Sequence, residues 1–208
     1  MQIALSNIKP HYMSESELSG SDIYLRPSVL FEQGQSYCVC AHSGHGKTSL
    51  LNFIYGVSRA YDGHIVYRPS QPDLFTLRRR HLSYLFQDLA LFDTLDAVEN
   101  VRLKNNLTQY KSEQQMEAML RSLLPSAKLH QPVGTLSFGQ RQRVAVVRAL
   151  CQPFDFLLLD EPFSHVDNDN ARLLAQMVTA EVEAQGAGLI VTALDPIDCF
   201  RFDHLLQL

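Results

Sequence analysis

The chain has 208 residues, of which 46% are hydrophobic, and a formal net charge of −4 at pH 7. This length and apolar content suit one domain, or one domain with an inserted lobe, and they exclude a disordered chain. The negative charge argues against general nucleic-acid binding, and the one dense basic run, residues 78–80, is short and is interpreted as a solvated helix face.

Neither export signals nor metal-binding cysteine patterns are recognisable. No apolar run has the length of a membrane span, and residues 1–6 lack the regions of a signal peptide, so a soluble, intracellular chain is expected. The four cysteines lack metal-ligand spacing, and Cys38 and Cys40 alternate in a strand so that they face the same way. All four are interpreted as small buried apolar residues.

Strand-like segments alternate with helical patterns, which predicts an α/β domain with a parallel sheet. The expected strands are residues 2–8, 23–31, 36–40, 64–67, 82–86, 156–160, 188–192 and 204–207. Between residues 87 and 150 the pattern is helical, and the expected helices are residues 97–103, 113–124 and 138–150. These helices predict a helical lobe inserted into the α/β core.

A glycine-rich loop joins the strand at residues 36–40 to a helical pattern that starts at Ser49. The loop comprises Ala41, His42, Ser43, Gly44, His45, Gly46, Lys47, Thr48 and Ser49. Its glycines give a triphosphate access to backbone N–H groups, Lys47 adds a charge for the β- and γ-phosphates, and Thr48 can ligate Mg²⁺. Ser49 can donate to an inner phosphate. The full pattern has glycine where this chain has Ala41, the smallest replacement, and binding is expected to survive.

Two adjacent carboxylates, Asp160 and Glu161, end the buried strand predicted at residues 156–160. In open parallel sheets ligands lie beyond the carboxyl ends of the strands, which is where these side chains would meet the phosphates. Neighbouring residues point in different directions, so one carboxylate can hold Mg²⁺ while the other faces an attacking water. A generic glycine turn and an exposed Asp-Glu-Pro turn are the bland alternatives, and the co-occurrence of both motifs disfavours them. The pair predicts a site that binds ATP or GTP and cleaves it.

A third motif, residues 136–140, precedes the amphipathic pattern of residues 138–150. Ser137 fits the N-cap of that helix. The free N–H groups of the helix N-terminus, with the serine hydroxyl and Gly139, make a second anion site. Two phosphate-binding surfaces on different lobes predict that two chains, head to tail, each close the nucleotide of the other.

The chain resembles the nucleotide-binding subunit of ATP-binding-cassette (ABC) transporters over essentially its whole length. The resemblance implies one cassette domain over residues 1–208. Residues 1–87 and 151–208 would form a RecA-like P-loop NTPase core, with a mostly parallel sheet and N-terminal antiparallel β elements. Residues 88–150 would form the helical signature subdomain.

The resemblance assigns roles to the motif residues. The family's signature, leucine-serine-glycine-glycine-glutamine, stands here with Phe138 in its first glycine position. It implies that Ser137 and Gly139 contact the γ-phosphate of the opposite nucleotide. The residues implied to contact the nucleotide across the dimer are Ser137, Phe138, Gly139, Gln140 and Asp167.

Further roles are implied by the same resemblance. Tyr12 would stack on adenine, and Gln87 would ligate Mg²⁺ and connect the site to the helical subdomain. Asp160 would hold Mg²⁺, and Glu161 would be the general base that polarises the attacking water. Residues 164–167 resemble the loop that contacts the opposite subunit, with His165 where alanine is usual.

One departure bears on catalysis. Family members usually carry a histidine after the last core strand, and Leu194 occupies that position here. Leucine can neither donate to a phosphate nor move a proton. Three explanations remain open: slow hydrolysis without the histidine, use of another group, of which His165 is the nearest candidate by motif, or an ATP-gated clamp that cycles rarely. His42 and His45 are interpreted as variable loop side chains, with backbone N–H groups doing the binding.

The residue pattern over 77–87 most resembles the branch of lipoprotein-release, macrolide-export and cell-division subunits. The implied cofactors are ATP and Mg²⁺. The implied partners are an integral membrane transporter subunit and a second nucleotide-binding subunit, expected to be another copy of this chain, with a heterodimer left open. The membrane subunit would dock beside Gln87 on residues 89–92 and hold the chain, cytoplasmic and peripheral, at the inner face of the cell membrane.

The expected function is an ATPase that drives conformational change in a membrane exporter or mechanotransmission complex. The alternative is a nucleotide-dependent regulatory clamp with little hydrolysis, which the leucine at position 194 motivates. A soluble ABC protein of translation or DNA repair is disfavoured, because such proteins usually carry tandem cassettes or long coiled-coil insertions. The sequence does not indicate the cargo or the direction of transport.

Overall fold

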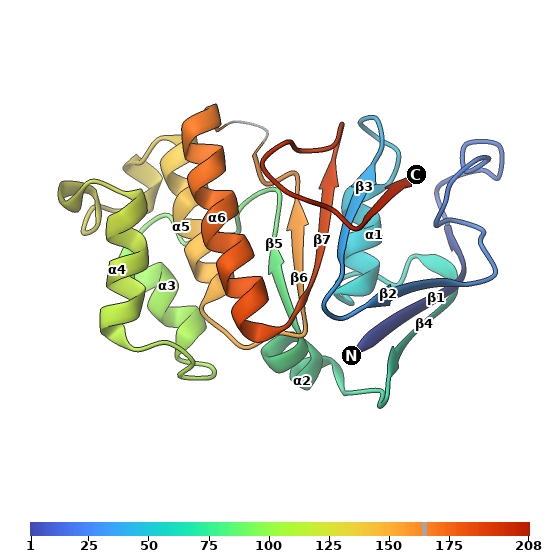
Figure 1. Cartoon of the computed structure of the whole chain (residues 1–208), viewed down its shortest axis with the longest axis horizontal. Coiled ribbons are helices and arrows are strands. Elements are labelled where there is room, and N and C mark those ends of the chain that lie inside the picture. Colours follow the sequence, from blue (N-terminus) through green and yellow to red (C-terminus); the bar gives the residue numbers. More distant parts are fainter. Residues whose placement is uncertain (164–165) are drawn as a thin grey trace.

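Two β-sheets lie side by side, and a group of helices lies beyond the far edge of the larger sheet (Figure 1). The computed structural model describes residues 1–163 and 166–208. The larger sheet is parallel and the smaller one, at the N-terminal end of the chain, is antiparallel. This arrangement confirms the predicted α/β fold class. No helix within the described residues is long and apolar enough to cross a membrane.

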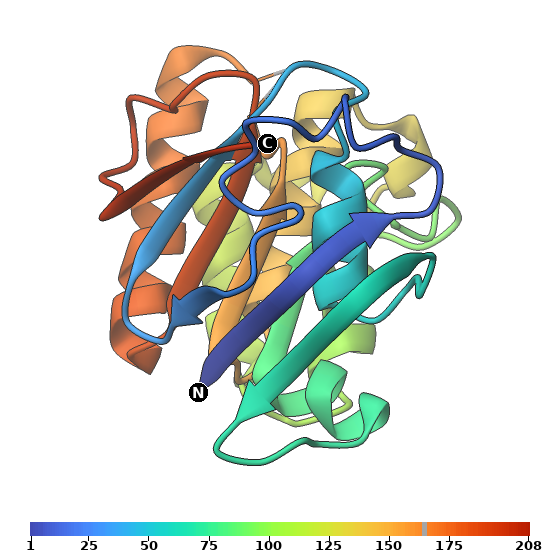
Figure 2. The ribbon, with the colours of Figure 1, turned by 90° about the vertical axis from the view of Figure 1, so that its right-hand side faces the viewer.

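The smaller sheet has the strand order β2-β1-β4. Its strands are β1 (Gln2–Pro10), β2 (Val29–Glu32) and β4 (Tyr61–Arg68). Side chains of β1 alternate between the two faces, so Ile3 and Leu5 are buried while their neighbours are partly exposed. They pack with Leu50 and Ile54 of helix α1 (Lys47–Ile54), which lies between the two sheets in Figure 2.

The predicted strand over residues 23–31 is correct only for its last part, since β2 begins at Val29. The preceding residues turn because the Ser21 hydroxyl accepts bonds from the N–H groups of Ile23 (3.1 Å) and Tyr24 (2.8 Å). Leu25 has a positive φ of 60°. Ile23 and Tyr24 are nevertheless fully buried, because this turn packs into the core around α1. Apolar burial alone therefore produced a strand-like pattern.

The larger sheet has the order β5-β6-β7-β3-β8. Its strands are β3 (Ser36–Cys40), β5 (Leu82–Leu85), β6 (Phe156–Asp160), β7 (Gly188–Ala193) and β8 (His204–Gln207). Every residue of β6 and β7 is buried, as expected for parallel strands covered on both faces. Helix α1 covers one face and α6 (Asn168–Gln185) lies over the other (Figure 1). The loops that follow β3, β6 and β7 consequently meet at one edge of the sheet.

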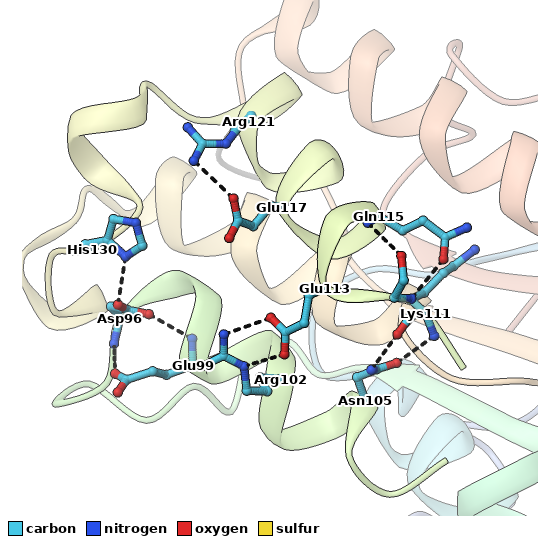
Figure 3. A network of polar contacts seen from close by, with 11 residues as sticks. Asp96, Glu99, Arg102, Asn105, Lys111, Glu113, Gln115, Glu117, Arg121 and His130 are labelled. Carbon is cyan, nitrogen blue, oxygen red and sulfur yellow. Dashed lines mark hydrogen bonds and ion pairs between the residues drawn. The ribbon is translucent and has the colours of Figure 1, made fainter. Parts of the chain in front are cut away.

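The helical region shares an apolar core with strands β5, β6 and β7, and polar contacts join its helices. Its helices are α3 (Ala97–Asn105), α4 (Glu113–Leu123) and α5 (Phe138–Leu150). Capping boxes at Asp96 and Ser112 start α3 and α4. The guanidinium of Arg102 forms a bidentate pair with Glu113 at 2.8 Å for both bonds, which joins the two helices (Figure 3). Short helical segments occupy Leu74–Thr76 (α2), Leu77–His81, Ser126–Lys128 and Val133–Thr135.

The basic run does not form the predicted solvated face. Arg78 donates to the carbonyls of Tyr55 (3.2 Å) and Gly56 (2.8 Å), just after α1. Arg79 donates to the carbonyl of Leu107 at 2.6 Å. The first two arginines therefore tie the segment before β5 to α1 and to the helical region, and of the three only Arg80 is exposed.

Candidate nucleotide-binding site

The glycine loop connects β3 to α1 as predicted. Gly46 is the N-cap of α1, with φ +86°, and no side chain caps the helix. The N–H groups of the first turn of a helix have no partner inside it, so they are available to an anion. Gly44 also has a positive φ, of +83°. The two glycines therefore allow the loop to turn without side chains that would cover its backbone N–H groups.

Lys47 is buried although it carries a charge. Its ammonium donates to the carbonyls of Ala41 (2.6 Å) and His42 (3.1 Å) and lies 3.3 Å from a carboxylate oxygen of Glu161. Oxygen atoms from the loop and from the end of β6 therefore surround the lysine. The glycine loop therefore holds one buried positive charge close to its own carbonyl groups.

Asp160 is held by neighbouring hydroxyl groups. Its carboxylate accepts bonds from Thr192 (2.7 Å) and Tyr84 (3.3 Å), and the Thr48 hydroxyl is a further hydrogen-bond partner. Burial raises the pKa of this carboxyl above its ordinary value, while the Thr192 and Thr48 bonds act in the opposite direction. Thr48 also donates to the Gln87 side chain at 3.3 Å. A carboxylate, a hydroxyl and an amide oxygen thus converge.

These three oxygen donors suit Mg²⁺. Magnesium prefers oxygen ligands and usually keeps several water or phosphate ligands beside one or two from the protein. Among the described residues there is no group of three or more histidine, cysteine, aspartate or glutamate side chains that could hold a metal ion alone. The donors at this corner are Thr48, Gln87 and Asp160, the residues predicted for Mg²⁺.

Glu161 follows Asp160 in a positive-φ conformation (+46°). Its N–H donates to the carbonyl of Thr192 at 3.1 Å, which anchors it to β7. The side chain reaches Lys47, whereas that of Asp160 contacts Thr192 and Tyr84. The two carboxylates therefore point in different directions, as the sequence predicts.

Lys47, Thr48, Gln87 and Glu161 line an open cleft of about 230 Å³, and Asp160 lies beside it next to Thr48. The lining of the cleft comprises Tyr12, Ser43, Gly44, Gly46, Lys47, Thr48, Ser49, Gln87 and Glu161. Tyr12 is 59% exposed, and its hydroxyl donates to the Ser49 hydroxyl. His42 and His45 are exposed, with ring centres 5.9 Å apart, and are not part of this lining.

The signature residues lie at the start of α5. Ser137 is its N-cap, accepting from Gln140 N–H at 3.3 Å while its own N–H donates to the Gln140 side chain at 3.1 Å. The guanidinium of Arg141 lies 5.7 Å from the centre of the Phe138 ring. Within the described residues, Ser137, Phe138, Gly139 and Gln140 are absent from the cleft lining. The structure therefore keeps the two predicted phosphate-binding surfaces apart in one chain.

Two other predictions concern the loop after Glu161. Asp167 is the exposed N-cap of α6, where the Asn170 side chain and N–H lower the pKa of its carboxyl. Ser164 and His165 lie outside the described residues, so the idea that His165 substitutes for the absent histidine stays a prediction. Leu194 is 54% exposed directly after β7, whose last residue, Ala193, pairs with Cys40 before the glycine loop.

Sequence reasoning assigned no role to several residues that support the site. Thr192 and Tyr84 position Asp160, and Gln142 of α5 donates to the carbonyl of Pro162, next to Glu161. Thr192 stands on the strand adjacent to β6, so a polar residue in an otherwise apolar strand was an available signal. The buried Gln142 in an apolar helix stripe was another.

A strand, glycine loop and helix, with a buried aspartate and a glutamate at the end of another strand of the same sheet, define a phosphate-loop nucleotide-binding protein. The family model described as "ABC transporter" matches residues 26–164. The chain belongs to the ABC transporter family, as an ATP-binding cassette. This result confirms the predicted family and, at the level of the family, an ATPase.

Individual relatives show how broad the similarity is. The chain is 29% identical to the lipoprotein-releasing system ATP-binding protein LolD of Syntrophotalea carbinolica over 199 residues, which cover 88% of this chain and 86% of that protein. It is 31% identical to the thiamine import ATP-binding protein ThiQ of Shigella sonnei over 183 residues, covering 85% and 78%. Some relatives are longer: the chain spans 48% of the sulfate/thiosulfate import protein CysA of Xylella fastidiosa.

Among solved structures, the bacterial ABC transporter cassette MJ0796 in its dimeric form superposes with a TM-score of 0.80 at 25% identity, covering 99% of this chain and 94% of the other. This likeness confirms the cassette fold. LolD and importer subunits stand at similar identity, so the comparisons include members of the predicted branch together with members of others.

Proposed function

We propose that the chain binds ATP with Mg²⁺ in the cleft around Lys47 and hydrolyses it when a second subunit closes the site. The observation that carries the proposal is the convergence of Lys47, Thr48, Gln87 and Glu161 on one cleft, with Tyr12 in its lining and Asp160 bonded to Thr48. Tyr12 would stack on adenine. The bound metal would neutralise phosphate charge and orient the γ-phosphate.

The residues of the chain have separable tasks in this scheme. Backbone N–H groups of the loop and the Lys47 ammonium would hold the phosphates, which is most of what phosphoryl transfer requires. Glu161 would accept a proton from the attacking water. Ser137 and Gly139 would approach the γ-phosphate from the opposite subunit, because in one chain they lie outside the cleft.

Head-to-tail dimerisation is the second part of the proposal. It is supported by the separation of the two phosphate-binding surfaces and by the fold shared with a cassette that is described as dimeric. Ser137 Oγ accepts a bond from Gln140 N–H, and its hydroxyl proton is available to a phosphate oxygen. We infer a homodimer, with a related subunit as the other option.

We also propose that the ATPase docks on a membrane subunit and drives a conformational change in it. The predicted docking segment, residues 89–92, holds Phe92, which is 57% exposed, and the exposed Ala90. Leu89 was predicted to be a contact residue, but it is 6% exposed and buried in the core that the helical region shares with the larger sheet, so that prediction is wrong. Exposed Leu103 of α3 adds a further apolar side chain on the helical region. The chain would be peripheral, held at the inner face of the membrane by this contact.

The alternative function is a nucleotide-gated clamp with little hydrolysis. It is motivated by Leu194, because an aliphatic side chain stands where the family places its phosphate-contacting histidine. The clamp and the ATPase share nucleotide binding and dimerisation, and they differ only in the rate of phosphate release. Export, import and mechanotransmission are equally compatible with both.

The decisive experiment measures phosphate release from Mg-ATP by the purified chain over a range of protein concentrations, beside Glu161→Gln. Asp169→Asn, which changes a carboxylate of α6 that is 97% exposed, is the matched control. Activity that rises with dimerisation and is lost only in Glu161→Gln supports the catalytic homodimer. Equal background rates in all three proteins favour the clamp.

A further inference from the structure

The buried side chain of Tyr24 contacts the glycine loop from behind. Its hydroxyl donates to the carbonyl of Gly46 at 2.8 Å, and the residue is 1% exposed. A Cβ atom at position 46 would lie 3.0 Å from the Tyr24 oxygen and 3.4 Å from the sulfur of Met13. The loop therefore rests directly on residues from the segment between β1 and β2.

This contact fixes the orientation of one peptide group. In a trans peptide the C=O and the following N–H point in opposite directions. Because the Gly46 carbonyl points to Tyr24, the N–H of Lys47 points away from Tyr24, on the side of the loop where an anion would bind. The same carbonyl also accepts the bond from Leu50 N–H at 2.9 Å, so both of its lone pairs are used.

The chemistry of Tyr24 suits this task. Burial, and secondarily the neighbouring Tyr12, raises the pKa of the Tyr24 hydroxyl, so it remains a donor across the physiological range. A hydrogen bond to the carbonyl end of a peptide polarises the whole peptide and strengthens its N–H as a donor. Phenylalanine would fill the same apolar space without this bond. The ring of Tyr24 is therefore sufficient to fill the core, and the hydroxyl is needed only for the bond to Gly46.

We propose that Tyr24 is a positioning residue for nucleotide binding, whose hydroxyl holds the Gly46–Lys47 peptide with its N–H directed at the phosphates. The proposal rests on the function proposed for the glycine loop. It assigns the segment between β1 and β2 a second contact with the site, in addition to Tyr12. Tyr24 touches no substrate and acts only through Gly46.

The test compares Tyr24→Phe with a matched variant at the other end of the same helix. Tyr67 is also buried, and its hydroxyl donates to the carbonyl of Ile54, the last residue of α1. Tyr67→Phe therefore removes the same kind of bond from the same helix, away from the glycine loop. Calorimetric titration would give the Kd for ATP and ADP, and steady-state kinetics would give KM and kcat.

Tyr24→Phe is expected to raise the Kd for both nucleotides and the KM for ATP about fivefold to tenfold, the effect of one lost hydrogen bond, with kcat little changed. Tyr67→Phe is expected to leave all of these values unchanged. Hydrogen exchange of the unliganded proteins supplies a second measurement. Exchange should accelerate across residues 44–50 in Tyr24→Phe and near residue 54 in Tyr67→Phe.

Lys47→Ala separates this proposal from the one on which it depends. If Lys47→Ala abolishes nucleotide binding while Tyr24→Phe binds as the unmodified chain does, Tyr24 has no positioning role. Equal losses of affinity in Tyr24→Phe and Tyr67→Phe would mean that both act through stability alone, which also overturns the proposal. If Lys47→Ala binds normally, the assignment of the loop itself fails.

Discussion

The ammonium group of Lys47 lies 3.3 Å from a carboxylate oxygen of Glu161, and the two side chains are only 4% and 18% exposed. The proposed phosphate-binding lysine and the proposed general base thus neutralise each other before any nucleotide enters. An incoming phosphate must compete with Glu161 for Lys47. Entry of ATP would therefore release the base at the moment when it is needed.

The first prediction follows from this ion pair. Glu161→Gln should bind ATP about fivefold more tightly than the unmodified chain. The Lys47–Glu161 ion pair contributes about 1 kcal/mol, and in the variant a phosphate no longer has to break this pair to reach Lys47. Hydrolysis should fall by about 100-fold or more, since the general base is lost. Calorimetry and phosphate release measure the two effects. Weaker ATP binding by the variant would contradict the competition.

The second prediction concerns pH and Mg²⁺. Burial raises the pKa of Asp160, so the folded chain takes up this proton at a higher pH than an ordinary aspartate does. Mg²⁺ needs the ionised form, and its affinity should fall as the pH falls towards the raised pKa. Thr192→Val removes the 2.7 Å donor to the carboxylate and should move that loss to higher pH.

Titration of Mg²⁺ in the ATPase assay between about pH 5 and pH 8 tests the shift. Thr76→Val is the control, because Thr76 donates to an exposed aspartate, Asp73, at the same 2.7 Å distance outside the cleft. An identical pH profile for Thr192→Val and the unmodified chain would show that this bond does not tune Asp160.

The third prediction addresses the contact between the helical region and the site. Gln142 is 2% exposed and donates to the carbonyl of Pro162, immediately after Glu161. Gln142→Met should lower kcat severalfold with the Kd for ATP unchanged, because α5 would no longer be tied to the segment that carries the base. Gln152→Met is matched: Gln152 is similarly buried, and it donates to the carbonyl of Leu82 instead. Equal kinetic effects of both variants would point to stability.

The fourth prediction concerns a partly buried lysine in α3. Burial, and secondarily Arg148, lowers the pKa of Lys104 to about 8. At pH values between the pKa of Lys104 in the folded chain and the higher pKa of a lysine in the unfolded chain, the unfolded chain binds a proton that the folded chain lacks. The free energy of unfolding should therefore rise with pH in this window. Lys104→Met should raise Tm by about 2–4 °C at pH 7 and by less at pH 10. A constant difference in calorimetric Tm across this range would rule out the proposed cause.

The fifth prediction tests the departure at position 194. Leu194→His should raise phosphate release about tenfold if the site lacks only a group that donates to the γ-phosphate. Leu205→His, on β8, is the control because Leu205 is exposed to a similar degree, 57%. No gain in Leu194→His would favour the clamp or another catalytic group.

The sequence predicted those strands of the larger sheet that have a regular hydrophobic pattern. Residues 36–40, 82–86, 156–160 and 188–192 formed strands within a residue of their expected limits, because parallel strands buried on both faces are continuous apolar runs. The prediction was wrong for residues 23–28, because the Ser21 hydroxyl accepts bonds that form a turn, and the buried Ile23 and Tyr24 in this turn are as apolar as strand residues. Pattern alone does not separate buried turns from strands.

For the site, the motifs located the groups that would touch nucleotide but not those that hold them. Tyr24, Tyr84 and Thr192 act through a hydrogen bond from a hydroxyl to a residue distant in the chain. The partner of such a bond is set by the tertiary fold, so the sequence does not identify it, even where a polar residue such as Thr192 stands out in an apolar strand. The roles of these positioning residues therefore follow only from the folded structure.

The capping box at Ser137 has a consequence for how the chain could evolve. The oxygen of Ser137 accepts a bond that starts helix α5, and its remaining proton can be offered to a phosphate of another subunit. Replacement of this serine would thus weaken folding and assembly together. Selection for a stable monomer would preserve the surface that we propose recognises a neighbour's nucleotide, even in copies of the chain that had ceased to turn over ATP.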